Sequence, residues 1–137
     1  MESYEHFIIS AVVSLPLIYM VAGFPSIALF TAYWLYSIAA GTLIDLDHFI
    51  ISTIRDRNFK EVRLALSSPK KILTDNNEAL DNTIPEWSRY ISHVAILLSF
   101  PLLLLNYSTV LAELTFAVLL VHLISDIYGS YREYYLE

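Results

Sequence analysis

Histidine and aspartate residues recur at the edges of the apolar segments of this chain, in combinations that could bind a metal ion. The sequence contains four histidines, at His6, His48, His93 and His122. Asp45 and Asp47 directly precede His48, in the stretch "IDLDH". Asp126 follows His122 at a spacing of i, i+4, which places the two side chains on one face of a helix. Imidazole and carboxylate ligands without a thiolate suit zinc, manganese or iron.

Four apolar segments must position these residues, and they cover about 7–24, 26–44, 91–106 and 109–127. Each approaches the ~20 residues that cross the hydrocarbon of a bilayer, and a backbone in lipid must satisfy its hydrogen bonds internally, so we expect helices. The short joints "GFPS" (23–26) and "LNYS" (105–108) predict two helical hairpins. The sequence therefore predicts an all-α integral membrane four-helix bundle, a single domain over 1–137 with a long loop at about 49–90.

The distribution of positive charge predicts the orientation of these spans. All eight Lys and Arg residues fall in the loop or the C-terminal tail: Arg55, Arg57, Lys60, Arg63, Lys70, Lys71, Arg89 and Arg132. The positive-inside rule places the loop and both termini in the cytoplasm, so we expect a multi-pass protein of the cytoplasmic membrane. In that topology all four histidines and the three aspartates lie at one end of the bundle.

Composition excludes several other classes of function. The chain is 56 % apolar and carries a net charge of −6, so it has no basic stripe for a nucleic-acid partner, and we expect membrane lipids as its surroundings. It has no cysteine, which excludes disulfides and thiolate ligands. The start, "MESYEHF", lacks the basic region of a secretory signal, so we expect the first span to remain in the mature protein.

Seven ligand-type side chains exceed the needs of one tetrahedral ion, so one or two divalent transition-metal ions are expected, with zinc favoured and manganese or iron as alternatives. Asp47 lies about 200° around an ideal helix from Asp45. Both carboxylates can face one centre only if the helix has ended there; otherwise Asp47 orients a histidine. The plainer alternative is that histidines and acids lie at membrane boundaries because charge costs less there.

Four blocks of the sequence resemble those of the LexA-regulated, membrane-bound metal-dependent hydrolase family: "EHFIIS", "LIDLDH", "SRYISHV" and "LLVHLISDIYG". The resemblance implies metal-ligand roles for His6, Asp45, Asp47, His48, His93, His122 and Asp126, and it matches Arg89 to an arginine of the family. Three positions depart from the family pattern. Ile44 replaces a proline, Ser88 stands where the family has a histidine, and Tyr90 replaces a glycine.

These residues lead us to expect a metal-dependent hydrolase at the cytoplasmic membrane interface, acting on a phosphoester of a lipid or other amphiphile. Asp45 or Asp47 is the expected general base, and Arg89 could clamp a phosphate. The alternative is a non-enzymatic scaffold, or an accessory subunit of a larger membrane complex, with a structural metal; a homo-oligomer is also open. A metal transporter would need polar groups through the bilayer, where the sequence places only Glu113.

Overall fold

The structure, a computed structural model, describes residues 3–47, 51 and 86–136. The elements in this part are α1 (Ser3–Ala22), α2 (Ile27–Leu43), the short 3₁₀ turn η1 (Ile44–Leu46), α7 (Glu86–Leu104) and α8 (Thr109–Leu136). The all-helical prediction is confirmed for these residues. His48 and most of the expected loop 49–90 lie outside them. Residues 86–90 of the expected loop belong to α7, and α8 continues to Leu136, beyond the expected span 109–127.

Local sequence explains where the helices begin and end. Gly23 follows α1 with φ +68°, a left-handed conformation that favours glycine, and its backbone N–H donates to the carbonyl four residues earlier (3.1 Å). Ser26 caps α2 by accepting the backbone N–H of Leu29 (3.4 Å). Ser108 caps α8 in the same way, at 3.3 Å. The turns therefore carry glycine and serine where the backbone requires them.

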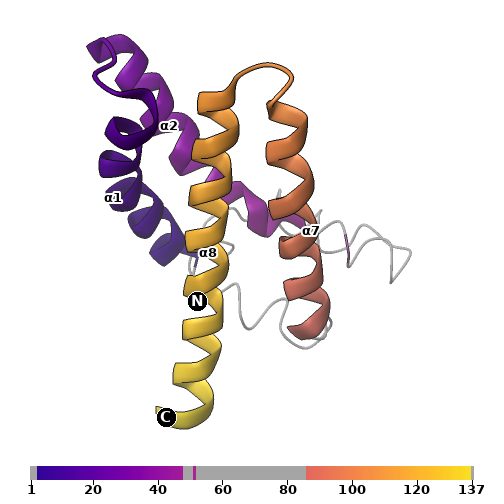
Figure 1. Cartoon of the computed structure of the whole chain (residues 1–137). Coiled ribbons are helices and arrows are strands. Elements are labelled where there is room, and N and C mark those ends of the chain that lie inside the picture. Colours follow the sequence, from indigo (N-terminus) through magenta and orange to yellow (C-terminus); the bar gives the residue numbers. More distant parts are fainter. Residues whose placement is uncertain (1–2, 48–50, 52–85, 137) are drawn as a thin grey trace, which may run out of the picture.

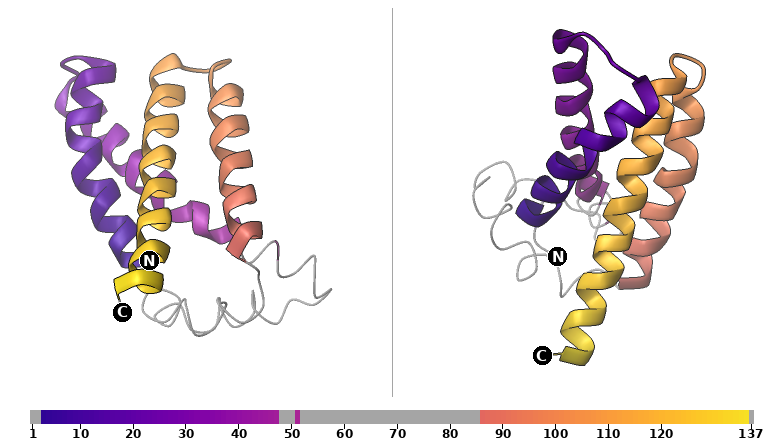
Figure 2. Two further views of the ribbon diagram at one scale, coloured as in Figure 1. Left: turned by 60° about the horizontal axis from the view of Figure 1, so that its bottom comes forward. Right: turned by 60° about the vertical axis from the view of Figure 1, so that its left-hand side comes forward.

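α8 is the central helix of the structure. It packs against α1, α2 and α7, and α1 packs in addition against α2. The turns between α1 and α2 and between α7 and α8 lie at the same end of the molecule (Figure 1). At the opposite end, the last turns of α2 lead η1 past α8 toward the first turns of α7 (Figure 2). The start of α1, η1, the first part of α7 and the second half of α8 therefore meet at one end.

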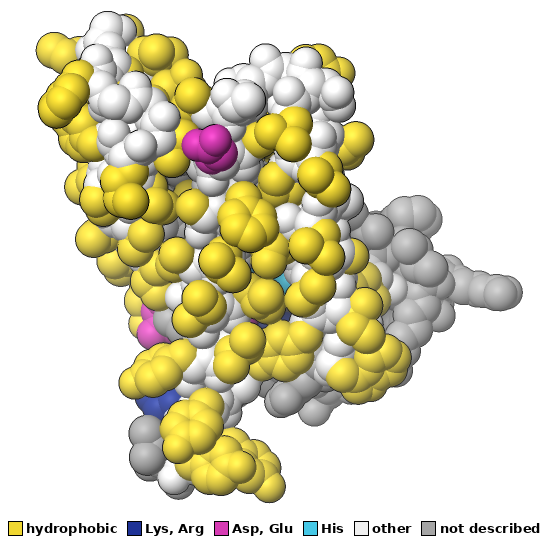
Figure 3. Space-filling model, viewed as in Figure 1, with side chains coloured by type: hydrophobic (Ala, Val, Ile, Leu, Met, Phe, Trp, Pro, Cys, Tyr) yellow, Lys and Arg dark blue, Asp and Glu magenta, His cyan; other side chains and the backbone are white. Residues whose placement is uncertain are grey.

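Three helical segments are long and apolar enough to cross a membrane: Tyr4–Ala22, Trp87–Leu104 and Thr109–Arg132. The fourth helix, α2, is equally apolar in character but has only 17 residues. Large apolar side chains face outward on every helix, and the face shown in Figure 3 is mostly hydrophobic. An exterior of this kind is suited to lipid, which indicates insertion into a membrane.

The interior of the molecule is more polar than its exterior. Hydroxyl and imidazole groups are buried where α1, α2 and α8 meet, at His6, Ser10, Ser14, Ser37, Thr115 and His122. Trp34 Nε1 donates to the carbonyl of Ala11 (2.9 Å), and the hydroxyls of Tyr36 and Thr115 are hydrogen-bonded to each other. Small and hydroxylated residues at helix interfaces, with apolar residues outside, are typical of helices that associate in lipid.

Candidate metal centre

The structure brings together six of the seven side chains that the sequence singled out as ligands. They come from four of the five described elements: His6 from α1, Asp45 from η1 with Asp47 directly after it, His93 from α7, and His122 and Asp126 from α8. The seventh, His48, lies outside the described residues. The three histidine side chains are at most 2 % exposed, and Asp45 is the most exposed member of the group at 13 %.

Two imidazole nitrogens and two carboxylate oxygens approach one point. His122 Nε2 lies 3.3 Å from Asp45 Oδ1 and 3.3 Å from Asp126 Oδ2. His93 Nε2 lies 3.6 Å from the same oxygen of Asp45 and 3.5 Å from the same oxygen of Asp126. Each nitrogen therefore faces both oxygens, and each oxygen faces both nitrogens.

These separations match those between the ligands of one metal ion. Two atoms bound to a tetrahedral zinc ion at about 2.0–2.2 Å lie about 3.3–3.6 Å apart. A direct hydrogen bond between charged nitrogen and oxygen is shorter, at about 2.7–2.9 Å. The four distances of 3.3, 3.3, 3.5 and 3.6 Å fall in the first range. The donor set therefore fits a divalent transition metal such as zinc.

Hydrogen bonds to the other ring nitrogen hold each of these two histidines in the orientation that a ligand needs. His93 Nδ1 donates to Asp47 Oδ2 (3.0 Å). His122 Nδ1 donates to the backbone carbonyl of Gly41 (2.7 Å). With the proton on Nδ1, the lone pair of each ring lies on Nε2, which points to the shared centre. Carboxylate and carbonyl partners of this kind usually orient histidines that bind metals.

The end of α2 explains how two carboxylates only two residues apart both serve this site. The α-helix stops at Leu43, and the 3₁₀ turn Ile44–Leu46 changes the direction of the chain before Asp47. Asp45 then reaches the centre itself, whereas Asp47 contacts the far side of the His93 ring. The structure thus combines the two arrangements considered from the sequence: the helix has ended, and Asp47 orients a histidine.

His6 joins the cluster from α1. Its ring stacks on that of His122, with centroids 3.9 Å apart, and its Nε2 lies 2.9 Å from Asp126 Oδ1. Asp126 therefore directs one oxygen to His6 and the other to His93 and His122. His6, Asp45, His122 and Asp126 each offer one ligand atom, and these four atoms all lie within 4.8 Å of one another. His6 is thus placed either to bind the same ion or to hold Asp126.

The charges of this cluster also favour a cation. Three carboxylates lie here with at most 13 % of each side chain exposed, and burial of unpaired negative charge is costly. For Asp45, which lies outside the membrane-spanning helices, burial by itself raises the pKa. The contacts with His122 and His93 outweigh burial and hold the pKa of that carboxyl well below its usual range. Asp45 is therefore ionised at neutral pH, as a metal ligand must be.

Gly41 belongs to the site, and the sequence analysis missed it. A Cβ at this position would lie 2.1 Å from Ser10 Oγ and 2.8 Å from Val118 Cγ1, so only glycine lets α1, α2 and α8 approach this closely. Its carbonyl lies in the last turn of α2, where no later residue of the helix donates the usual backbone N–H to it. The carbonyl is therefore available to His122. The available signal was a glycine inside an apolar span, four residues before Asp45.

The remaining positions of interest lie around the centre. Arg89 is half-buried on α7, one helical turn before His93 and on the same face. Tyr90, at the position where the resembled family has a glycine, donates a hydrogen bond from its hydroxyl to Ser130 Oγ (2.7 Å) and so joins α7 to α8. Glu113 is exposed near the start of α8, about 13 Å along the helix from His122 and on the opposite face.

Comparison of the chain with protein-family models, with curated proteins and with solved structures finds no match. The resemblance to the membrane-bound hydrolase family therefore rests on the four short sequence blocks alone.

Proposed function

We propose that this protein is a membrane-embedded hydrolase that depends on a divalent transition metal and cleaves a phosphoester of a lipid or other amphiphile. The observation that carries the proposal is the approach of His93, His122, Asp45 and Asp126 to one point at ligand-to-ligand distances. A donor set of histidines and carboxylates without cysteine is typical of catalytic rather than structural zinc sites. The resemblance to the membrane-bound hydrolase family implies the same chemistry.

The residues of the chain have separable roles in this proposal. A divalent ion, when bound, lowers the pKa of a water molecule and polarises the scissile group. His93 and His122 hold it through Nε2, while Asp47 and the Gly41 carbonyl fix the two rings. Asp45 is the most exposed carboxylate of the cluster, so the substrate approaches from its side. Asp45 and Asp47 are the two candidates for the group that accepts the proton of the attacking water.

The position of the site at one end of apolar helices favours an amphiphilic substrate. We place the four helices across the membrane as two hairpins, with the centre and both termini at the cytoplasmic side, as the distribution of Lys and Arg in the sequence favours. The last turns of α8 carry exposed tyrosines, Tyr128, Tyr131, Tyr134 and Tyr135. Tyrosine is enriched where a membrane meets water, so this segment fits the headgroup region, beside the site.

A structural metal is the second candidate, and one observation favours it. Five side chains, those of His6, Asp45, His93, His122 and Asp126, surround the centre, which is more than the four that close a structural zinc site. In that case the metal would join α1, η1, α7 and α8 without catalysis. The protein would then act as a scaffold or as an accessory subunit of a membrane complex.

Metal analysis of the protein purified in mild detergent tests the first half of the proposal. We expect one to two equivalents of a transition metal in the wild type and a loss of at least one equivalent in His122→Ala. Leu114→Ala is the matched control, since Leu114 is a fully buried residue of the same helix, two turns away from the ligand. That variant should unfold at a lower temperature and keep its metal. Equal metal content in all three proteins would refute the site.

Turnover of a fluorogenic phospholipid in mixed micelles tests the second half. We expect hydrolysis by the wild type, none by His122→Ala, and reduced turnover by Asp47→Asn at saturating metal. If the wild type holds its metal but cleaves none of a panel of phosphomonoesters and phosphodiesters, and removal of the metal lowers its unfolding temperature, the structural alternative takes the place of the hydrolase.

A further inference from the structure

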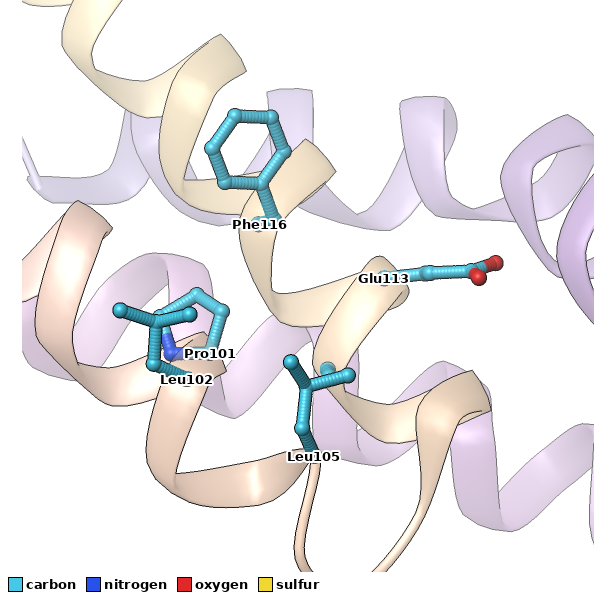
Figure 4. Close-up of a pocket in the computed structure, with 6 residues that line it drawn as sticks. Pro101, Leu102, Leu105, Glu113 and Phe116 are labelled. Carbon is cyan, nitrogen blue, oxygen red and sulfur yellow. The ribbon is translucent and has the colours of Figure 1, made fainter.

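An apolar groove lies between α7 and α8, at the end of the molecule away from the metal centre. It encloses about 290 Å³ and is lined by Pro101, Leu102, Leu105, Ala112, Glu113 and Phe116. Figure 4 shows the apolar side chains on both helices around the groove, with the Glu113 side chain extending outward from α8. Five of the six lining residues are apolar, so the groove is suited to a hydrocarbon chain and has a single carboxylate at its edge.

The carboxylate lies about one turn from the end of a membrane helix. Glu113 lies inside the apolar segment Thr109–Arg132, about 6 Å along the helix from Thr109. Its side chain is exposed, and it forms no ion pair with any residue that the structure describes. Ionisable residues within membrane spans are rare and usually have a polar or charged partner.

Neither Arg89 nor Arg132, the two cationic residues in the part of the chain that the structure describes, lies beside Glu113, since Arg89 is in the first turn of α7 and Arg132 is near the C-terminal end of α8. All eight Lys and Arg residues belong to the central loop, the first turn of α7 or the C-terminal end of α8, none of them to the segments around the two short turns. The described residues therefore leave the exposed carboxylate open to another molecule with a positive charge at this depth.

We propose that the groove and Glu113 together bind a phospholipid whose headgroup carries a primary amine. One acyl chain lies along Pro101, Leu102 and Phe116, and the ammonium group donates hydrogen bonds to the Glu113 carboxylate. The depth is appropriate for both parts, since Glu113 is near the end of the span, where headgroups lie, and Phe116 is one turn deeper. A primary ammonium has three donors, whereas the quaternary ammonium of a choline lipid has none.

Retention of lipid by the intact protein, measured by native mass spectrometry after extraction from vesicles, tests this proposal. The vesicles contain equal amounts of phosphatidylethanolamine and phosphatidylcholine with identical acyl chains. We expect the wild type to retain the ethanolamine lipid about two- to fivefold more than the choline lipid, the size of effect that a partly exposed ion pair produces. Glu113→Gln, which keeps the shape of the side chain, should retain the two lipids equally.

A pair of tryptophan variants tests the groove itself. Leu102 lines the groove and is 63 % exposed, whereas its neighbour Leu103 is 61 % exposed and does not line it. Leu102→Trp should fill the groove and lower retention of both lipids, and Leu103→Trp should behave as the wild type. Three results would overturn the proposal: no preference in the wild type, a preference that persists in Glu113→Gln, or equal effects of the two tryptophans. A crosslink between this face and a Lys-bearing helix of another protein would also overturn the proposal, because that helix would then be the occupant of the groove.

Discussion

Substitution of Gly41 by alanine should damage the metal centre without touching a ligand. The added Cβ would lie 2.1 Å from Ser10 Oγ, 3.0 Å from Ser10 Cβ and 2.8 Å from Val118 Cγ1. Real Cβ atoms do not approach other atoms this closely, so α2 must move away from α1 or α8. Because the carbonyl oxygen of the same residue accepts a hydrogen bond from His122 Nδ1 (2.7 Å), this movement also withdraws the acceptor that orients a ligand.

The expected effect of Gly41→Ala has three parts: overpacking and helix propensity change the stability, and the lost hydrogen bond changes the metal affinity. Overpacking of a close-packed interface costs about 1–3 kcal/mol, and two neighbours inside 3.0 Å place Gly41→Ala at the upper end. The better helix propensity of alanine returns about 1 kcal/mol, so we expect a net loss of about 2 kcal/mol in the free energy of unfolding. Loss of a hydrogen bond that orients a ligand lowers metal affinity by about 10- to 100-fold.

Competition with a chelator measures the affinity, and thermal unfolding in detergent measures the stability. Ser10→Gly is the natural second variant, because it removes two of the three close contacts, leaving only that to Val118. The double variant Ser10→Gly, Gly41→Ala should recover part of both losses. If Gly41→Ala binds metal as tightly as the wild type, or if Ser10→Gly gives no recovery, the close approach of the helices is not what positions His122.

Three further outcomes follow from the same contacts. Asp47→Asn should lower metal affinity by about 10- to 100-fold in the chelator assay while the stoichiometry at saturation stays unchanged, since this residue orients His93 and is not itself among the ligands at the shared point. Metal affinity should fall as the pH is lowered, because protons compete with the metal for the histidine nitrogens, and titration calorimetry should detect no separate step for Asp45 near neutral pH, since its contacts with His122 and His93 hold the pKa of that carboxyl well below its usual range. Tyr36→Phe removes the hydroxyl pair with Thr115 and should lower the free energy of unfolding by about 0.6–1.7 kcal/mol in detergent, with full metal content.

The helical fold could be predicted from the sequence because few backbone structures are stable in lipid. A backbone in hydrocarbon must form helices, so apolar runs with Gly and Ser at the short turns between them are sufficient to locate four helices. The ends of the helices were harder to predict. The first turn of α7 carries Glu86 and Arg89, and the last turns of α8 carry Arg132, so the apolar pattern fades before the helices stop. Charged residues continue a helix beyond the hydrocarbon, and hydropathy alone does not detect this.

The histidines and aspartates of the site could be predicted from their residue type and from their positions at the ends of the apolar segments. Six of the proposed side chains meet in one cluster, because helices joined by short turns return their other ends to the same side. The contacts that each of these side chains makes could not be predicted. Which oxygen of Asp126 faces His6 and which faces His93 depends on side-chain rotation, and the position of Asp47 depends on a 3₁₀ turn of only three residues. Gly41 binds His122 through its backbone carbonyl. Every residue has this group, so residue type alone does not reveal the contact.

The polar interior and apolar exterior of this protein connect its fold to the site. In water, a buried cluster of three imidazoles and three carboxylates would lose strong hydration, and burial of apolar groups would have to compensate for that loss. In lipid, the unfolded but inserted helices already lack water, so the polar groups gain by meeting one another between the helices. The serines that accompany His6 along α1 allow close approach at the same interface. Association of the helices and assembly of a cation site are therefore one process, and loss of the cation should loosen the helices at this end first.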